Sequence, residues 1–175
     1  MRMKSLFLSL VAVLALTPLT RADDATVKLS KVHMCCDKCV NGAAKAVSKV
    51  DGVTITSDKT ARTIVLTASD TTTLQKAVDA LVKAGFFGES SDASIKVSTD
   101  TGAKGEKVST LKVEGVHLCC PSCVKALNKA LGDVPGYVSN DATKGAESFE
   151  VKGYFKDSDV FDALQKAGLT GKVGQ

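Results

Sequence analysis

The chain of 175 residues is 44% hydrophobic and 5% aromatic, and its formal net charge is +4. This length and apolar content suffice for two modest cores, and no stretch has the composition of a disordered chain. Arg2, Lys4 and Arg21 supply most of the excess positive charge. The remaining lysines are interspersed with acidic and hydroxyl side chains, whereas a nucleic-acid-binding protein gathers them on one face. We therefore expect no nucleic-acid partner.

The first 22 residues have the parts of a secretory signal peptide. Arg2 and Lys4 precede an apolar run over residues 6–16, and residues 20–22 offer a cleavage site. The apolar run is about 11 residues long, whereas a membrane-spanning helix needs roughly 20. We predict that residues 1–22 are a cleaved signal peptide. The mature protein is then secreted or periplasmic, with no membrane span after cleavage.

Residues 25–97 begin with a strand and a helix joined by a cysteine-containing loop. Alternating apolar residues predict the strand over residues 27–32. Apolar side chains at helical spacing predict the helix over residues 40–50, and Asp51-Gly52 ends it.

A hairpin and a second helix follow in the same segment. Residues 53–55 and 63–67 alternate as two strands on either side of a polar turn. The second helix covers residues 74–81 and ends at Gly85. Residues 95–97 are predicted to form a short final strand.

The same elements recur in residues 107–175. A shift of 84 residues places Val27 on Leu111 and Gly52 on Gly136, as expected for a duplicated domain. The order βαββαβ predicts two tandem ferredoxin-like α+β domains, each a four-stranded antiparallel sheet with two helices on one face. The polar, glycine-containing residues 98–106 are predicted to be the linker, a flexible tether.

All six cysteines lie in two matching clusters of the form His-x-Cys-Cys-x-x-Cys. The first cluster is residues 33–39 and the second is residues 117–123. Thiolates bind Cu(I), Zn(II) and other soft cations well, and a Cys-x-x-Cys at a helix start brings two sulfurs to one ion. The positive end of the helix also favours thiolate at neutral pH.

Both repeats resemble the heavy-metal-associated domain found in copper chaperones, the periplasmic mercury-binding protein and metal-transporting P-type ATPases. The loop of that family reads Gly-Met-x-Cys-x-x-Cys, and residues 34–39 fit it with Cys35 in the variable slot. The resemblance implies these metal ligands: Cys36 and Cys39 in the first domain, and Cys120 and Cys123 in the second. It also implies a metal-transporting ATPase or another cysteine-bearing metal acceptor as the partner.

The two loops depart from the family pattern. His33 and His117 replace its glycine, and Leu118 replaces its methionine in the second loop. The added Cys35 and Cys119 supply a third sulfur in each loop. Two sulfurs suit near-linear Cu(I) or Hg(II), and three suit a trigonal site or most of a tetrahedral Zn(II) or Cd(II) site.

We expect Cu(I) as the bound ion, with Zn(II), Cd(II) and Hg(II) as alternatives. The added cysteines, Cys35 and Cys119, are further metal ligands in this prediction. His33 and His117 are candidate ligands as well, although a structural role at the end of the first strand is the stronger interpretation for both.

Two other functions use the same cysteines. A thiol–disulfide oxidoreductase is one, because residues 120–123 read Cys-Pro-Ser-Cys. A disulfide-stabilised interaction module is the other, because exported proteins often pair their cysteines. Three cysteines per domain would leave one unpaired, and the first loop lacks the proline. No other catalytic motif is present, so the sequence predicts a metal chaperone or scavenger rather than an enzyme. Whether the two sites act separately or share one cluster stays open.

Overall fold

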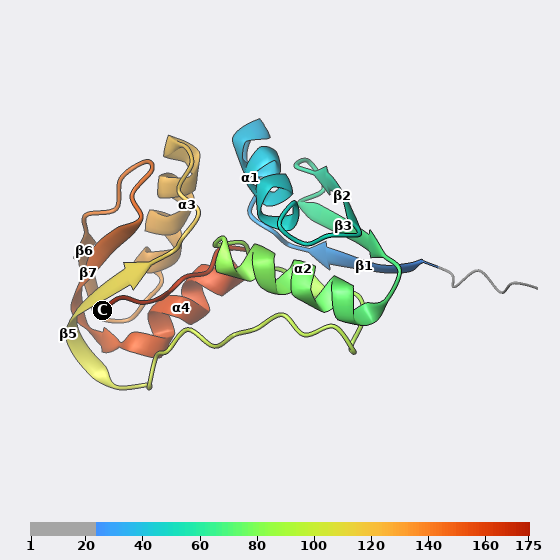
Figure 1. The fold of residues 1–175 in the computed structure, drawn as a ribbon. Helices are drawn as coiled ribbons and strands as arrows, with labels where there is room; N and C mark the ends of the chain where they lie inside the picture. The colour runs from blue at the N-terminus through green and yellow to red at the C-terminus, as the bar shows by residue number, and fades with distance from the viewer. Residues whose placement is uncertain (1–23) are drawn as a thin grey trace, which may run out of the picture.

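The computed structural model describes residues 24–175, so the predicted signal peptide over residues 1–22 lies outside the described residues. Two α+β domains of similar build lie side by side, with their helices toward the middle of the molecule (Figure 1). Within residues 24–175, no helix combines the length and the apolar character needed to cross a membrane.

The first domain is a four-stranded antiparallel sheet with two helices. Its elements in chain order are β1 (Ala25–Ser30), α1 (Asp37–Val47), β2 (Val53–Asp58), β3 (Thr63–Ala68), α2 (Thr71–Lys83) and β4 (Glu89–Ser90). The strand order is β2-β3-β1-β4, so β1 and β3 lie in the centre. This is the predicted ferredoxin-like arrangement.

The second domain repeats this architecture. Its elements are β5 (Lys107–Glu114), α3 (Pro121–Gly132), β6 (Tyr137–Asn140), β7 (Ser148–Lys156), α4 (Asp157–Lys166) and β8 (Lys172–Val173). The strand order β6-β7-β5-β8 matches that of the first domain, and all neighbouring strands are antiparallel. The predicted fold class is confirmed for both copies.

The periodicity of the sequence accounts for the core. Alternate residues of β3 point to the helices, and Ile64, Leu66 and Ala68 are buried there. Cys39 and Ala43, four residues apart on α1, are buried on the facing side of that helix. The buried side chains form one contiguous hydrophobic cluster that extends through both domains. The two domains therefore share a packed boundary.

The predicted final strand of the first domain over residues 95–97 is wrong. The edge strand is β4, whose Glu89 and Ser90 pair with Ser30 and Leu29 of β1. The chain pairs with β1 soon after it leaves α2, so the edge is taken before residue 95 is reached. Ile95 is still buried, at 3% exposure, but it covers the core from a loop.

Residues 98–106 connect the domains along the side of α2 and α4 (Figure 1, yellow-green). This segment contacts the second domain. The carbonyl of the buried Thr101 accepts a hydrogen bond of 2.8 Å from the amide of Val173. The amide of Lys104 donates one of 2.9 Å to the Asp157 carboxylate.

Candidate metal centre

The two cysteine loops lead into α1 and α3, and each helix begins directly after a cysteine. Cys36 is the N-cap of α1 and Cys120 is the N-cap of α3. Both have extended backbones, and neither helix has a side-chain hydrogen bond at its cap. Helix N-termini carry amides without intrahelical partners and about half a positive charge. Both cysteine loops therefore offer a favourable place for thiolates.

A short cross-domain interface brings the two loops together. Phe86, after α2, and Leu169, after α4, form an antiparallel bridge. The carbonyl of Gly85 accepts a hydrogen bond of 3.1 Å from the Thr170 amide. The carbonyl of Gly168 accepts one of 3.0 Å from the amide of His33, at the start of the first cysteine loop. The domain interface is thus hydrogen-bonded directly to the start of the first cysteine loop.

Two glycines at equivalent positions permit this close approach. Gly85 has a φ of +87° and Gly168 has a φ of +83°, a backbone region that residues with a side chain rarely adopt. A Cβ atom on Gly168 would lie 2.5 Å from the His33 amide nitrogen. A Cβ atom on Gly85 would collide with the equivalent amide of His117. Any larger residue at either position would push the two domains apart.

The six cysteine sulfurs meet across the domain boundary. The Sγ atom of Cys35 lies 3.2 Å from that of Cys120 and 3.5 Å from that of Cys123. The Sγ atom of Cys39 lies 3.4 Å from that of Cys119 and 3.8 Å from that of Cys123. All six are free thiols in this structure. The two domains therefore build one site together.

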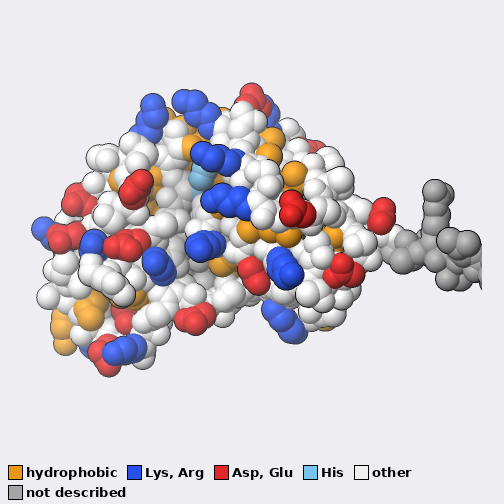
Figure 2. Space-filling view, in the orientation of Figure 1, with side chains coloured by type: hydrophobic (Ala, Val, Ile, Leu, Met, Phe, Trp, Pro, Cys, Tyr) orange, Lys and Arg blue, Asp and Glu red, His pale blue; other side chains and the backbone are white. Residues whose placement is uncertain are grey.

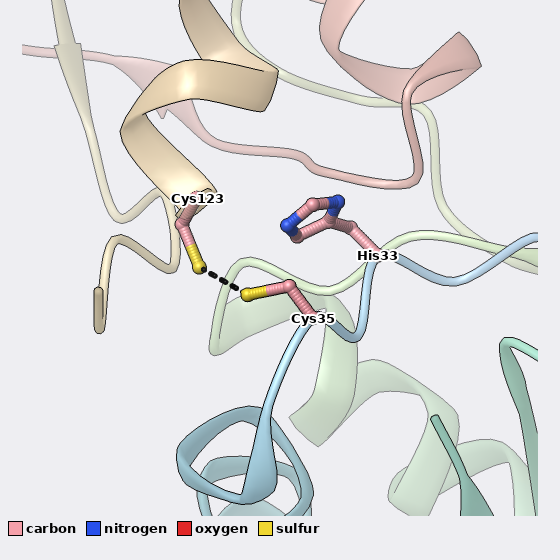
Figure 3. Close-up of side chains that lie close together, drawn as sticks. All are labelled: His33, Cys35 and Cys123. Carbon is pink, nitrogen blue, oxygen red and sulfur yellow. Dashed lines mark hydrogen bonds between the residues drawn. The ribbon is translucent and has the colours of Figure 1, made fainter. Parts of the chain in front are cut away.

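The site has a buried side and a solvent-exposed side. Cys39 and Cys123 are 0% exposed, whereas Cys35 is exposed to solvent. Figure 3 shows Cys35 and His33 on the first domain facing Cys123, which lies at the start of α3. A soft cation can reach the sulfurs through the exposed Cys35 side and be held against the buried pair.

Groups of three ligand atoms recur around the cluster. Each group has all its donor atoms within 4.8 Å of one another, and the groups are His33-Cys35-Cys123, Cys35-Cys36-Cys120, Cys36-Cys39-Cys119 and Cys119-Cys120-Cys123. Three of the four groups combine cysteines from both domains, or a histidine of one domain with a cysteine of the other. The residues present fit a soft metal ion, since thiolate is its preferred ligand.

The thiols do not ionise equally. A hydrogen bond from Cys123 and the neighbouring His117 imidazole lower the pKa of Cys39 to about 2, against the opposing effect of burial. At Cys120, burial raises the pKa of the thiol, but hydrogen bonds from Cys35 and Cys123 outweigh it and lower the pKa to about 6. Burial and the nearby Cys39 thiolate raise the pKa of Cys119 to about 12. Without a cation, the cluster therefore holds a mixture of thiolates and protonated thiols.

The two histidines flank the buried sulfurs. The Nε2 atoms of His33 and His117 are buried without a hydrogen-bond partner. The ring of His117 lies 4.4 Å from that of Phe86, and burial lowers the pKa of His33. Each histidine thus approaches the buried cysteine of the other domain, His33 toward Cys123 and His117 toward Cys39.

Basic side chains surround a hollow beside the cluster. Arg62, Lys129 and Lys166, with one carboxylate, Asp133, line a space of about 320 Å³ that His33 also lines. Figure 2 shows lysine and arginine side chains around the hollow between the two domains, where a histidine is visible. Arg62 also donates a hydrogen bond of 3.2 Å to the carbonyl of Ala167 in the other domain. Positive charge at this place favours a cluster of thiolates.

Neither a protein-family model nor a curated protein matches the chain. The solved structures that resemble it include the following three. The N-terminal domain of PacS from Synechocystis PCC6803 is 23% identical over 39% of this chain and 100% of that one, with a TM-score of 0.35. The apo form of the HMA domain of the copper chaperone for superoxide dismutase is 25% identical over 49% of this chain and 85% of that one, with a TM-score of 0.35. The N-terminal soluble domains of Bacillus subtilis CopA are 16% identical over 87% of this chain and 95% of that one, with a TM-score of 0.33.

The strand order and the cysteine cluster themselves define the class of protein. It is a tandem pair of ferredoxin-like domains whose clustered cysteines can hold a metal ion. All six cysteines predicted as ligands lie in this one site, and both histidines lie beside it. No role for Arg62 or Gly168 at the boundary was predicted from the sequence. The repeated Ala-Gly motif at residues 84–85 and 167–168 was the signal for the glycines.

Proposed function

We propose that this protein is an exported soft-metal-binding protein that binds Cu(I) and serves as a metal chaperone or scavenger. One observation carries the proposal: six free thiols from two domains lie together, and two of them are fully buried. Thiolate is the preferred ligand of soft cations, and Cu(I) is one of them. Export rests on the signal-peptide features of residues 1–22.

The size of the ligand groups supports Cu(I) over Zn(II). Structural Zn(II) requires four ligands in a tetrahedron. The groups of close donor atoms found among residues 24–175 have three members each. Three sulfurs suit a trigonal soft cation, so Zn(II), Cd(II) and Hg(II) are the alternatives to be tested against Cu(I).

The exposed Cys35 supports exchange with a partner. A thiolate from an incoming protein can attack an ion at this edge while the buried sulfurs still hold it, so the metal passes without being released to solvent. We propose a cysteine-bearing metal acceptor, such as a metal-transporting ATPase, as the partner.

Competition with a chromogenic Cu(I) chelator tests the proposal. Mature protein is purified without oxygen and titrated against the preformed chelator complex, with Zn(II) and Cd(II) in parallel arms. We expect the protein to withdraw Cu(I) stoichiometrically and to keep it in excess Zn(II). Protein with all thiols alkylated is the control and should withdraw none. Equal retention of Cu(I) by the alkylated protein, or no retention by the native one, would remove the proposal.

Thiol–disulfide exchange is the second candidate, and Cys120 favours it. Its lowered pKa of about 6 and its place before Pro121 resemble a reactive Cys-Pro-x-Cys thiol. Insulin reduction separates the two functions. We expect a rate no higher than that of a small free dithiol, because Cys120 and Cys123 lie against Cys35 of the first domain. A high rate that is lost in Cys120→Ser and kept in Cys119→Ser would favour the oxidoreductase instead.

A further inference from the structure

We infer that the six cysteines form a single site for four Cu(I) ions bridged by six thiolates, rather than one two-sulfur site per domain. This inference rests on the proposed function and specifies its capacity. It follows from how the sulfurs are connected in space, since every cysteine has near neighbours in both loops.

Four groups of three sulfurs cover the whole cluster. In three of these groups the Sγ atoms all lie within 4.8 Å of one another. In the fourth group the Sγ separations are 3.6 Å for Cys35–Cys39, 3.5 Å for Cys35–Cys123 and 3.8 Å for Cys39–Cys123. They are Cys35-Cys36-Cys120, Cys36-Cys39-Cys119, Cys119-Cys120-Cys123 and Cys35-Cys39-Cys123. Every cysteine belongs to two groups, and any two groups share one cysteine. This is the connectivity of four three-coordinate ions joined by six bridging thiolates.

The absence of some contacts agrees with this arrangement. Six sulfurs connected in this way form an octahedral shell, in which each sulfur has one opposite sulfur that it does not contact. The opposite pairs are Cys35 with Cys119, Cys36 with Cys123, and Cys39 with Cys120. No sulfur contact joins an opposite pair among the seven contacts of residues 24–175, all of which follow edges of the shell.

The distances suit ion-filled triangles after a small expansion. With a metal–sulfur bond of about 2.3 Å, three sulfurs around a trigonal ion lie about 4.0 Å apart. The seven Sγ contacts range from 3.2 to 3.8 Å. Cysteine side chains can move outward by these few tenths of an ångström through small χ1 rotations, with no change of fold.

The charge of the filled site is also suitable. Four univalent ions and six thiolates carry a net charge of −2, whereas one ion would leave most of the sulfurs repelling one another or protonated. The N-termini of α1 and α3 both begin at cluster cysteines, Cys36 and Cys120, and each supplies about half a positive charge. Around the adjoining hollow, Arg62, Lys129 and Lys166 outnumber the one carboxylate, Asp133. The surroundings can therefore accommodate the excess negative charge.

Shared thiolates make filling cooperative. The first ion draws in sulfurs from both loops and fixes the positions that the later ions need. A chain built in this way stores several ions at once, which favours scavenging or buffering over the transfer of single ions.

Anaerobic titration with Cu(I), supplied as its acetonitrile complex and followed by native mass spectrometry, tests the inference. We expect metal-free and four-copper protein to be the main species at every point below saturation. Saturation at one or two ions, or even passage through one, two and three, would overturn the cluster but leave the proposed function standing. Failure to retain any copper would overturn both.

A matched pair of variants sharpens the test. Cys35 belongs to two of the four triangles, so Cys35→Ser should bind at most two copper ions. Ser122 lies in the first turn of α3, is exposed and supplies no ligand atom, so Ser122→Ala should still bind four. Circular dichroism establishes that both variants are folded. Binding of four ions by a folded Cys35→Ser protein would contradict the inference.

Discussion

The Sγ atoms of Cys35 and Cys120 lie 3.2 Å apart, although 85 positions separate the two residues in the chain. Neither domain can build this contact alone, because each cysteine belongs to a different copy of the repeat. The metal centre is therefore a property of the domain boundary, and changes at that boundary should alter metal binding without touching a cysteine.

Gly168→Ala should open the boundary. The new Cβ would press on the backbone of the first domain at His33, and the positive φ of Gly168 adds strain. We expect a loss of about 1–3 kcal/mol in the free energy of unfolding, and a fall in copper capacity, measured by thermal unfolding and by native mass spectrometry.

Gly132→Ala is the control for this experiment. Gly132 ends α3, and a Cβ there would meet nothing within 4 Å. This variant should keep the melting temperature and the full copper load. If Gly168→Ala also keeps both, the boundary does not hold the cluster together.

Copper binding should release protons. The pKa of Cys35, Cys119 and Cys123 is raised, by burial at Cys35 and Cys119 and by a hydrogen bond to Cys39 at Cys123. These thiols are protonated at neutral pH and must lose their protons to bind a metal. The apparent affinity for Cu(I) should therefore fall as the pH is lowered below neutrality.

A pH-stat titration at neutral pH measures this release directly. We expect at least three protons for each filled cluster, one from each of those thiols. Loading without proton release would mean that the thiols are already ionised, contrary to the geometry of the cluster.

His117→Phe should separate ring packing from the electrostatic effect of the imidazole at the buried end of the site. Phenylalanine keeps an aromatic ring beside Phe86 but removes the imidazole that helps to lower the pKa of Cys39. A polar interaction with a charged group contributes about 1.5–3 kcal/mol, so we expect a roughly ten- to hundredfold weaker affinity for Cu(I) with an unchanged copper count. Loss of a copper ion from the count would show instead that His117 is a metal ligand.

The sequence predicted the fold well because its signals are local. Alternation in β3 and helical spacing in α1 report directly which face of each element is buried. The final strand of the first domain was misplaced because β4 has only two residues, too few to show a period. Its position is set by pairing with β1 across the sheet.

The site was predicted residue by residue but not as one object. The two cysteine loops are 84 positions apart, and nothing in their local pattern states how the domains are oriented. That orientation depends on a few contacts, such as the Phe86–Leu169 bridge and the carbonyl of Gly168. Periodicity arguments describe single elements, so they cannot predict these contacts.

Copper K-edge X-ray absorption of the fully loaded mature protein tests the central claim most directly, because it counts the sulfurs around each ion and detects neighbouring metals. The account predicts three sulfurs per copper together with a Cu–Cu scattering contribution, since every ion shares thiolates with its neighbours. Two sulfurs per copper with no Cu–Cu contribution would describe separate sites, one in each domain, and would contradict a shared six-cysteine centre.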